Sequence, residues 1–339
     1  MTDLLSSDPP KQPDGVILLE LADQAATATS AWCPLDERAL LRVTGADAEA
    51  FLQGQLTQDM SRLAEGQVLL AAHCTPKGRI TALFRAWKLA DAFLLDAPAA
   101  LASAAQRRLA MYVLRAKVQV ASAAADWERT GVAGEALGTV LDDLGYPRPE
   151  AAGQLLRNGD LHCLKVGPAR WIALAPARAD SGLRSRLADR TAPSREGWAL
   201  AGLRDGDPEV LAETVEAFVP QMLNLDLLDG ISFRKGCYTG QEIVARTHYL
   251  GRVKRRMRRF TYLGEAPPRP GQLVPIGASG EAGALAGAHA SGAETAGSPD
   301  SDPRPAPAAG APQAEIVLAV QTHAGGGEAL AVAAEVAEP

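Results

Sequence analysis

Residues 230–246 read Gly-Ile-Ser-Phe-Arg-Lys-Gly-Cys-Tyr-Thr-Gly-Gln-Glu-Ile-Val-Ala-Arg, and this stretch decides how the rest of the chain is interpreted. Its single cysteine, Cys237, follows the basic residues Arg234 and Lys235 and one glycine. Positive charge beside a thiol lowers the thiol pKa and favours the nucleophilic thiolate. The stretch therefore predicts a functional site in which Cys237 is an exposed nucleophilic or metal-binding thiol and Lys235 is its basic companion.

The same stretch predicts the start of a helix. Thr239-Gly-Gln-Glu242 fits the capping box, in which the Thr and Glu side chains satisfy the first backbone N–H groups of a helix. We expect this helix to begin at Gly240 and to end near Gly251. Cys237 would then lie just ahead of a helix N-terminus, whose partial positive charge also favours a thiolate. The alternative is that Cys237 is a small buried hydrophobe, as most free cysteines are.

Polar side chains are concentrated on both sides of this cysteine. Such groups converge where a protein holds a planar, polar ligand in one orientation. The composition of the region therefore predicts a ligand site next to the cysteine. The polar residues concerned are Gln221, Asn224, Asp226, Gln241, Glu242 and Arg246.

The bulk composition is that of an ordinary globular protein. The chain has 339 residues, 47% hydrophobic and 22% charged, which predicts two or three domains. A net charge of −6 supplies no overall field that attracts nucleic acid or an anionic membrane. The N-terminal residues lack the basic and apolar segments of a signal peptide, and no apolar run of about 18 residues occurs. We therefore expect a cytoplasmic monomer without membrane contact or stable nucleic-acid binding.

The spacing of the cysteines excludes the common zinc-binding and redox motifs. The four cysteines are widely separated and form no Cys-x-x-Cys pair, so neither a zinc site nor a thioredoxin-type pair is predicted. Four cysteines could make two disulfides, but reduced thiols are the better expectation without a secretion signal. The sequence thus predicts no metal site built from these motifs, and no residue is assigned as a metal ligand.

Apolar runs and turn signals predict an α+β protein with antiparallel strands. The clearest element is a hairpin of residues 67–75 and 79–89, because Pro76-Lys-Gly78 places a glycine at the turn. A Gly-, Ala-, Ser- and Pro-rich stretch cannot bury enough apolar surface to become ordered. The expected division is a disordered tail at 1–13, a first unit at 14–125 with contributions from 195–250, a second unit at 126–194, and a β-barrel at 251–339 with a disordered insertion at about 277–313.

The segment Lys235-Gly-Cys-Tyr-Thr-Gly-Gln-Glu242 resembles the signature of the YgfZ family, folate-binding proteins related to the aminomethyltransferase of the glycine cleavage system. Further matches lie at Phe51-Leu-Gln-Gly-Gln-Leu-Thr-Gln-Asp59, Ala71-Ala-His-Cys-Thr-Pro-Lys-Gly78 and Phe218-Val-Pro-Gln221. The resemblance covers about residues 35–260. It implies an aminomethyltransferase-like folate-binding fold, with two α/β-sandwich (ferredoxin-like) units and a small C-terminal β-barrel around a central channel.

The resemblance also implies a ligand and a role. The ligand is tetrahydrofolate, the partners are iron–sulfur client proteins, and the family's function depends on the residue that corresponds to Cys237. Trp198 matches a family tryptophan associated with folate, and an aromatic plane can stack on a pterin. Its apolar neighbours equally suit a core residue, so both interpretations stand. The cofactor-binding residues expected in this way are Trp198, Gln221, Asn224, Tyr238, Gln241, Glu242 and Arg246.

Three positions depart from the family pattern. The stretch from Asp96 to Gln106 has no Asp at the place of the aminomethyltransferase catalytic residue, which argues against aminomethyl transfer. Arg204 stands about where the family often has a pterin-binding Glu, with Asp205 as a candidate replacement. Arg38 lies in the stretch where a further family tryptophan is expected.

The run Arg252-Val-Lys-Arg-Arg-Met-Arg-Arg259 carries six basic residues. It suits an RNA or phosphate patch, or a charged strand edge that discourages pairing with other chains. We favour a mixed interpretation, in which some of these residues and Arg246 hold the carboxylates of a folate tail.

Three functional hypotheses follow. The leading one is a tetrahydrofolate-binding accessory protein for iron–sulfur cluster assembly or repair, and thereby for tRNA modification by iron–sulfur enzymes, acting through the Lys-Gly-Cys motif. The second is a folate-dependent one-carbon or aminomethyl transferase. The third is an accessory role in tRNA modification without folate. The chain is expected not to be a conventional enzyme.

Overall fold

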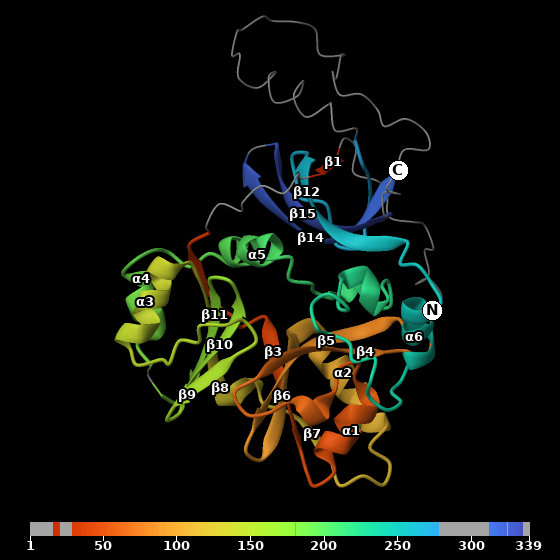
Figure 1. Cartoon of the computed structure of the whole chain (residues 1–339). Helices are drawn as coiled ribbons and strands as arrows, with labels where there is room; N and C mark the ends of the chain where they lie inside the picture. Colours follow the sequence, from red (N-terminus) through yellow and green to blue (C-terminus); the bar gives the residue numbers. More distant parts are fainter. Residues whose placement is uncertain (1–15, 21–28, 180, 278–311, 324, 335–339) are drawn as a thin grey trace, which may run out of the picture.

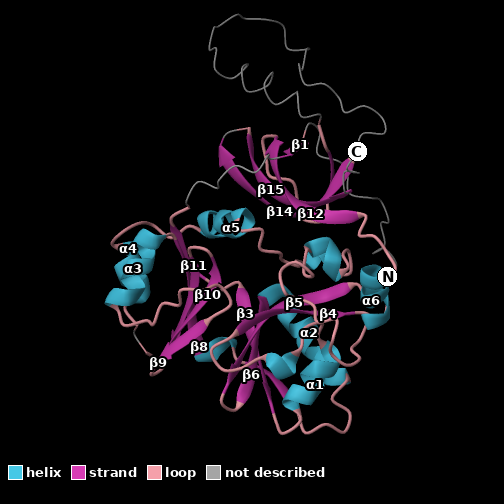
Figure 2. Ribbon diagram, viewed as in Figure 1, coloured by secondary structure: helices cyan, strands magenta, loops and turns pink. Residues whose placement is uncertain are grey.

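The computed structural model describes residues 16–20, 29–179, 181–277, 312–323 and 325–334. Within these ranges the frame consists of three five-stranded antiparallel sheets (Figure 1), whose strands are magenta in Figure 2. Of the stretches that predict disorder, residues 1–13 and 278–311 lie outside the described part of the chain.

The first sheet has the strand order β4-β5-β6-β3-β7, and two helices cover it. Strands β4 and β5 form the predicted hairpin, in which the backbone N–H of Thr75 donates to the Arg79 carbonyl at 2.8 Å. Gly78 closes the turn with a φ of 70°. The helices pack Phe51, Leu52 and Leu109 onto the apolar face of the sheet. The elements are β3 (Arg38–Thr44), α1 (Ala48–Gln55), β4 (Val68–Cys74), β5 (Ile80–Leu89), β6 (Ala92–Pro98), α2 (Ala99–Met111) and β7 (Gln119–Ser122).

The second sheet has the order β2-β8-β11-β10-β9. Helices α3 and α4 pack on one of its faces around Leu141, Trp171 and Leu187. Its other face shares a core with the first sheet, where Trp87 and Leu94 meet Ile172 and Leu174. The elements are β2 (Ala31–Pro34), β8 (Trp127–Ala133), α3 (Glu135–Asp143), β9 (Leu155–Asn158), β10 (Leu161–Gly167), β11 (Arg170–Pro176) and α4 (Leu183–Ala188).

The third sheet has the order β1-β12-β15-β14-β13 and is nearly closed. A bridge between Leu18 and Ile276 joins its two edges, so that it forms the expected small barrel. Strand β1 pairs with β12 and does not belong to the unit at 14–125, which corrects the division expected from the sequence. This pairing buries Leu18 beside Phe260, an apolar contact between distant segments that local patterns do not reveal. The elements are β1 (Ile17–Glu20), β12 (Arg255–Leu263), β13 (Leu273–Pro275), β14 (Gln313–His323) and β15 (Gly326–Ala334).

Two helices outside the sheets complete the frame and lead to the site. Helix α5 (Arg195–Arg204) contacts strands of the second sheet and of the barrel (Figure 1). Its N-terminus is capped by Ser194, whose hydroxyl oxygen accepts from the Gly197 N–H at 2.9 Å. Helix α6 (Gln241–Tyr249) lies beside the β4–β5 hairpin and buries Val244 in a core shared by the first sheet and the barrel.

Candidate functional site

The loop that carries Cys237 is anchored on the residues that follow α1. The Lys235 ammonium is buried and donates hydrogen bonds to two backbone carbonyl oxygens, of Leu56 at 2.8 Å and of Gln58 at 2.7 Å. Removing the lysine would leave both carbonyls without this donor. Lys235 therefore determines where the loop lies, two residues before the cysteine.

The cost of burying the Lys235 charge is only partly offset by its neighbours. Burial lowers the pKa of its ammonium to about 8, against a weaker opposing effect of the Asp59 carboxylate. The ammonium also lies 5.2 Å from the ring centroid of Tyr238, in cation–π contact. Tyr238 itself is buried, and burial raises the pKa of its phenol. The side chains of Lys235 and Tyr238 thus contact each other in the protein interior, beneath the loop.

The capping box expected at Thr239 and Glu242 does not form. Helix α6 has Gly240 at its N-cap, with a left-handed φ of 86° and no side-chain cap. The N-cap is therefore one residue later than the predicted Thr239. Gly240 takes this position in a backbone conformation that residues with a side chain disfavour. The helix also ends at Tyr249, slightly short of the predicted end.

Gly240 is required because the backbone passes very close to the β4–β5 turn. A Cβ at this position would lie 2.5 Å from the carbonyl oxygen of Thr75. The turn has the same requirement, since a Cβ on Gly78 would lie 3.0 Å from the Cβ of Ile243 in α6. These two glycines seat the start of α6 on the hairpin and so determine where the preceding Cys237 lies.

Cys237 is exposed, whereas the other cysteines are buried. All four lie in the described part of the chain and are free thiols. Burial raises the pKa of the Cys33 thiol to about 11 and those of the Cys74 and Cys163 thiols to about 12. Reactivity follows the thiolate form and access to it. Of the four thiols, Cys237 is therefore the one available to a partner.

This difference can be measured with a thiol reagent such as dithionitrobenzoate at neutral pH. The folded protein is expected to release one equivalent rapidly, and the denatured protein four, because the buried thiols lack both access and thiolate character. The Cys237→Ala variant should lose the rapid equivalent and keep three in denaturant. Two or more rapid equivalents in the folded wild type would contradict the assignment.

Two of the amides predicted to bind the ligand, Gln221 and Asn224, donate hydrogen bonds to backbone carbonyls. Buried Gln221 donates through Nε2 to the Val244 carbonyl of α6 at 2.7 Å. Asn224 donates through Nδ2 to the Met257 carbonyl of β12 at 2.9 Å. These bonds connect the segment before the loop to α6 and to the barrel. The remaining predicted residues of this group lie on α6, with Gln241 half-buried and Glu242 and Arg246 exposed.

Two large cavities lie between the sheets, away from most of these residues. The first, of about 470 Å³, is lined by both sheets and by residues 205–208, 228 and 229. The second, of about 370 Å³, is lined by Trp198 and residues of β3, β11 and α5. Among the predicted cofactor-binding residues, all of which the structure describes, Trp198 lines the second cavity and the others line neither. The structure thus separates Trp198 from the cysteine loop.

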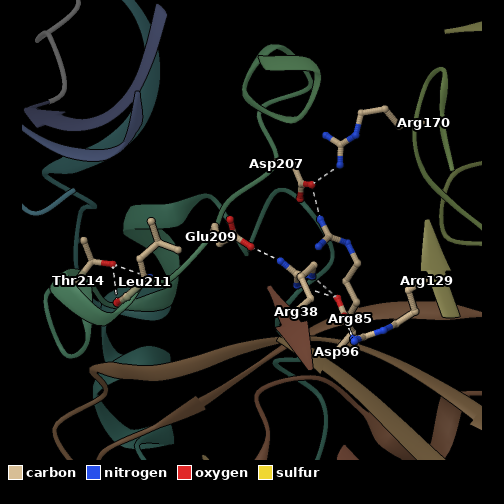
Figure 3. Close-up of polar contacts among 9 residues, drawn as sticks. All are labelled: Arg38, Arg85, Asp96, Arg129, Arg170, Asp207, Glu209, Leu211 and Thr214. Carbon is tan, nitrogen blue, oxygen red and sulfur yellow. Dashed lines mark hydrogen bonds and ion pairs between the residues drawn. The ribbon is translucent and has the colours of Figure 1, made fainter. Parts of the chain in front are cut away.

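A buried network of arginines and carboxylates, several of which line the cavities, connects the first two sheets (Figure 3). Asp207 accepts from Arg170 at 2.7 Å and also pairs with Arg85, which joins the second sheet to the first. Burial on its own raises the pKa of Asp207, but the two guanidiniums hold it below its usual value. Asp205 lies 3.3 Å from Arg170, and burial raises its pKa.

A second part of the network lies on β3 and β6. Arg38 pairs with Asp96 at 2.7 Å and with Glu209. Arg129 lies 3.9 Å from Asp96 on its other side. Asp96 is almost completely buried, at 3% exposure, and lines neither of the two cavities. Its carboxylate is thus committed to holding strands together.

Trp198 is packed on both the second sheet and an arginine. A Cβ on Gly131 of β8 would lie 2.8 Å from the indole ring, so this glycine makes room for it. The Arg170 guanidinium lies 4.7 Å from the centroid of the ring, in cation–π contact. Trp198 is half-buried and lines the second cavity, so its packing and ligand-binding interpretations are compatible.

The basic residues expected to hold a folate tail are largely paired within the protein. Arg256 binds the Asp226 carboxylate through both terminal nitrogens, at 2.9 and 2.8 Å. Arg255 lies 3.3 Å from Glu315, and Arg259 lies 3.5 Å from Glu328. Arg204 also pairs with Glu328, at 2.6 Å, and so stabilises the contact of α5 with the barrel.

Sequence reasoning missed part of the ion-pair network near the cavities. Arg85, Arg170 and Asp207 belong to none of the motifs that marked the site. A usable signal was present, because Arg85 interrupts the apolar strand Ile80–Leu89 and Asp96 interrupts Ala92–Pro98. A charge in a buried strand needs a partner, so isolated charges in such strands indicate an internal ion-pair network.

Within the described residues, no group of three or more His, Cys, Asp or Glu side chains is placed to hold a metal ion. No described helix combines the length and the apolar character needed to cross a membrane.

The comparisons with known proteins agree with this architecture. The aminomethyltransferase T of the glycine cleavage system from Bartonella henselae superposes with a TM-score of 0.56 at 16% identity, covering 91% of this chain and 79% of that one. The fold is therefore of the aminomethyltransferase type. No family model matches the sequence.

Curated relatives identify the family more narrowly. The tRNA-modifying protein YgfZ of Enterobacter sp. (strain 638) is 34% identical over 254 residues, which is 74% of each chain. The proteins of the same name from Shigella boydii serotype 4 (strain Sb227) and Escherichia coli (strain K12 / DH10B) show the same identity and coverage. The chain belongs to the YgfZ family.

Proposed function

We propose that this chain is a tetrahydrofolate-binding accessory protein for iron–sulfur cluster assembly or repair, and thereby for tRNA modification by iron–sulfur enzymes. The observation that carries the proposal is the exposed Cys237 thiol on a loop anchored by the buried Lys235. A thiol held in this way can meet a partner's cluster or thiol without rearranging the fold. The name of the curated relatives, tRNA-modifying protein, supports the tRNA part.

The residues between the sheets suit a folate. A pterin offers ring faces and an amino-pyrimidinone edge, for which Trp198 and the Asp205 carboxylate are appropriate partners. The folate tail is anionic and needs donors. Arg170 has a buried Nε without a hydrogen-bond partner among the described residues, and it lines the second cavity. Tetrahydrofolate would supply a reduced pterin that can carry a one-carbon unit.

The first cavity is connected to the cysteine loop through the chain itself. Leu228 and Asp229 line this cavity, and the loop that ends at Cys237 begins directly after them. Gly230 accepts a hydrogen bond from the Thr57 hydroxyl at 2.7 Å, beside the carbonyls that hold Lys235. A ligand in the cavity would therefore touch the residues from which the loop departs. We include in the proposal that folate binding positions this loop for client proteins.

A transferase function is less well supported. Asp96 is the single acidic residue of the stretch 96–106, and the Arg38 ion pair and burial withdraw it from any ligand. Without a free carboxylate there, the stretch supplies no base for an aminomethyl substrate. The residues favour binding over turnover.

Isothermal titration calorimetry with tetrahydrofolate under reducing, anaerobic conditions tests the ligand. We expect one site per chain, and a Trp198→Ala variant that binds about tenfold more weakly, because an aromatic stacking contact is worth about 0.5–1.5 kcal/mol. Tyr249→Ala is the matched control, because Tyr249 is exposed on α6 and lines neither of the two cavities. A wild-type protein that gives no binding heat and no thermal shift with tetrahydrofolate would overturn the folate part of the proposal.

A further inference from the structure

We propose that Asp207 is a built-in competitor for the ligand's carboxylate, occupying the Arg85 and Arg170 guanidiniums that this carboxylate must capture. The inference rests on the proposed folate function and adds the residues that limit binding of the anionic tail. It begins from the position of Asp207. The two cavities have three lining residues in common, Arg85, Asp207 and Pro208. The Arg85–Asp207 ion pair therefore stands at the partition between them, and a ligand longer than one cavity has to pass it.

Asp207 differs in this respect from the other acids of the network. Asp205 lines the first cavity and Glu209 the second, whereas Asp207 lines both. Asp96 lines neither. A carboxylate in either cavity can therefore reach Arg85, one of the two arginine partners of Asp207. No other described acid of the network occupies this shared position.

The two arginines are suited to exchange one carboxylate for another. A guanidinium offers five N–H donors, and planar pairing with a carboxylate is its strongest common interaction. The Arg170 side chain is 4% exposed, and its Nε has no hydrogen-bond partner within the described residues. Arg85 is also nearly buried, at 11% exposure. Water competes weakly in such a place, so the choice lies between Asp207 and a ligand anion.

Charge balance gives the exchange its direction. The network pairs the arginines 38, 85, 129 and 170 with the acids 96, 205, 207 and 209, four of each sign. An added carboxylate would make this buried cluster net negative unless an acid withdraws. The guanidiniums keep the pKa of Asp207 low, so protonation does not remove its charge near neutral pH. The competing charge is therefore present wherever the protein binds its ligand.

The chain around Asp207 allows such a withdrawal. Asp207 lies in the irregular segment between α5 and residue 212, outside any helix or strand. It follows Gly206, which has a φ of 69°, and a Cβ added to this glycine would meet no atom within 4 Å, so space is open beside it. A small change of this segment would move the carboxylate away from Arg85 while both arginines stay on their strands. In the proposed exchange Asp207 is therefore the partner that moves, and the two arginines stay on their strands.

The test compares tetrahydrofolate with a reduced pterin that lacks the glutamate tail, titrated into wild type and isosteric variants. Asp207→Asn is expected to bind tetrahydrofolate about tenfold more tightly, because the arginines lose their internal competitor. Arg85→Gln is expected to bind it about tenfold more weakly. The tail-less pterin should show neither effect. Asp142→Asn removes a carboxylate from the exposed Arg148 ion pair on α3 and serves as the control for net charge.

The outcomes separate this inference from the proposed function. Wild-type binding of tetrahydrofolate with unchanged or weaker binding by Asp207→Asn overturns the competitor and leaves the folate proposal intact. Equal changes for the tail-less pterin also overturn it, because the effect would then not involve the tail. Absence of binding by the wild type overturns the folate proposal and this inference with it. If Asp207→Asn is poorly folded, unchanged binding of tetrahydrofolate by Arg85→Gln is the overturning result.

Discussion

Alanine at Cys237 is expected to abolish the support of iron–sulfur client enzymes while leaving the fold intact. The side chain is exposed, so the free energy of unfolding should change by no more than about 0.5 kcal/mol. The lost group is the one accessible thiol, so the effect on function should be close to complete. The measurement is the extent of a tRNA modification made by an iron–sulfur enzyme, in cells that lack their own YgfZ protein and express the variant.

Cys163→Ala is the matched control for this experiment. Cys163 is fully buried in the core of the second sheet, so its replacement is expected to cost about 1 kcal/mol of stability while preserving function per folded molecule. Tetrahydrofolate titration of Cys237→Ala adds a second control, since binding should match the wild type. A Cys237→Ala strain with a normal level of the modification would remove the cysteine from the proposal.

The local elements near the site were predictable from sequence. The β4–β5 hairpin follows from two apolar runs around Pro76-Lys-Gly78, and the structure has the turn there. Helix α6 follows from the pattern after Cys237, although the capping box that indicated it does not form. Short-range signals describe an element well because the interactions that form it lie within a few residues.

The interior of the site was not predictable in the same way. Arg85 and Asp207 are 122 residues apart, and Arg38 and Glu209 are 171 apart. Each pair forms only because the fold brings separate strands and loops together, and a charge in a buried strand does not reveal which distant residue it pairs with. The roles of Gln221 and Asn224 were hidden for a related reason. Their amides point to backbone carbonyls of α6 and β12, which the sequence does not place beside them.

Alanine at Gly240 is expected to be the most destabilising single change near the cysteine. The residue has a φ of 86°, which costs an alanine about 1–2 kcal/mol. The added methyl group would also lie 2.5 Å from the Thr75 carbonyl oxygen, and relieving such a clash costs about 1–3 kcal/mol more. Urea denaturation should therefore show a loss of about 2–5 kcal/mol in the free energy of unfolding.

Gly159→Ala separates the two causes. Gly159 has a φ of 60° in a turn between β9 and β10, and a Cβ there would have no atom within 4 Å. The Gly159→Ala variant is therefore expected to lose only the backbone contribution, about 1–2 kcal/mol in the free energy of unfolding. The difference in stability between the two variants measures how tightly α6 packs on the hairpin.

Because the hairpin contact also positions Cys237, Gly240→Ala should change the rate of thiol labelling even in its folded fraction, and Gly159→Ala should not. Equal losses of stability and equal labelling rates in both variants would mean that the close approach at Thr75 does not hold the cysteine loop in place.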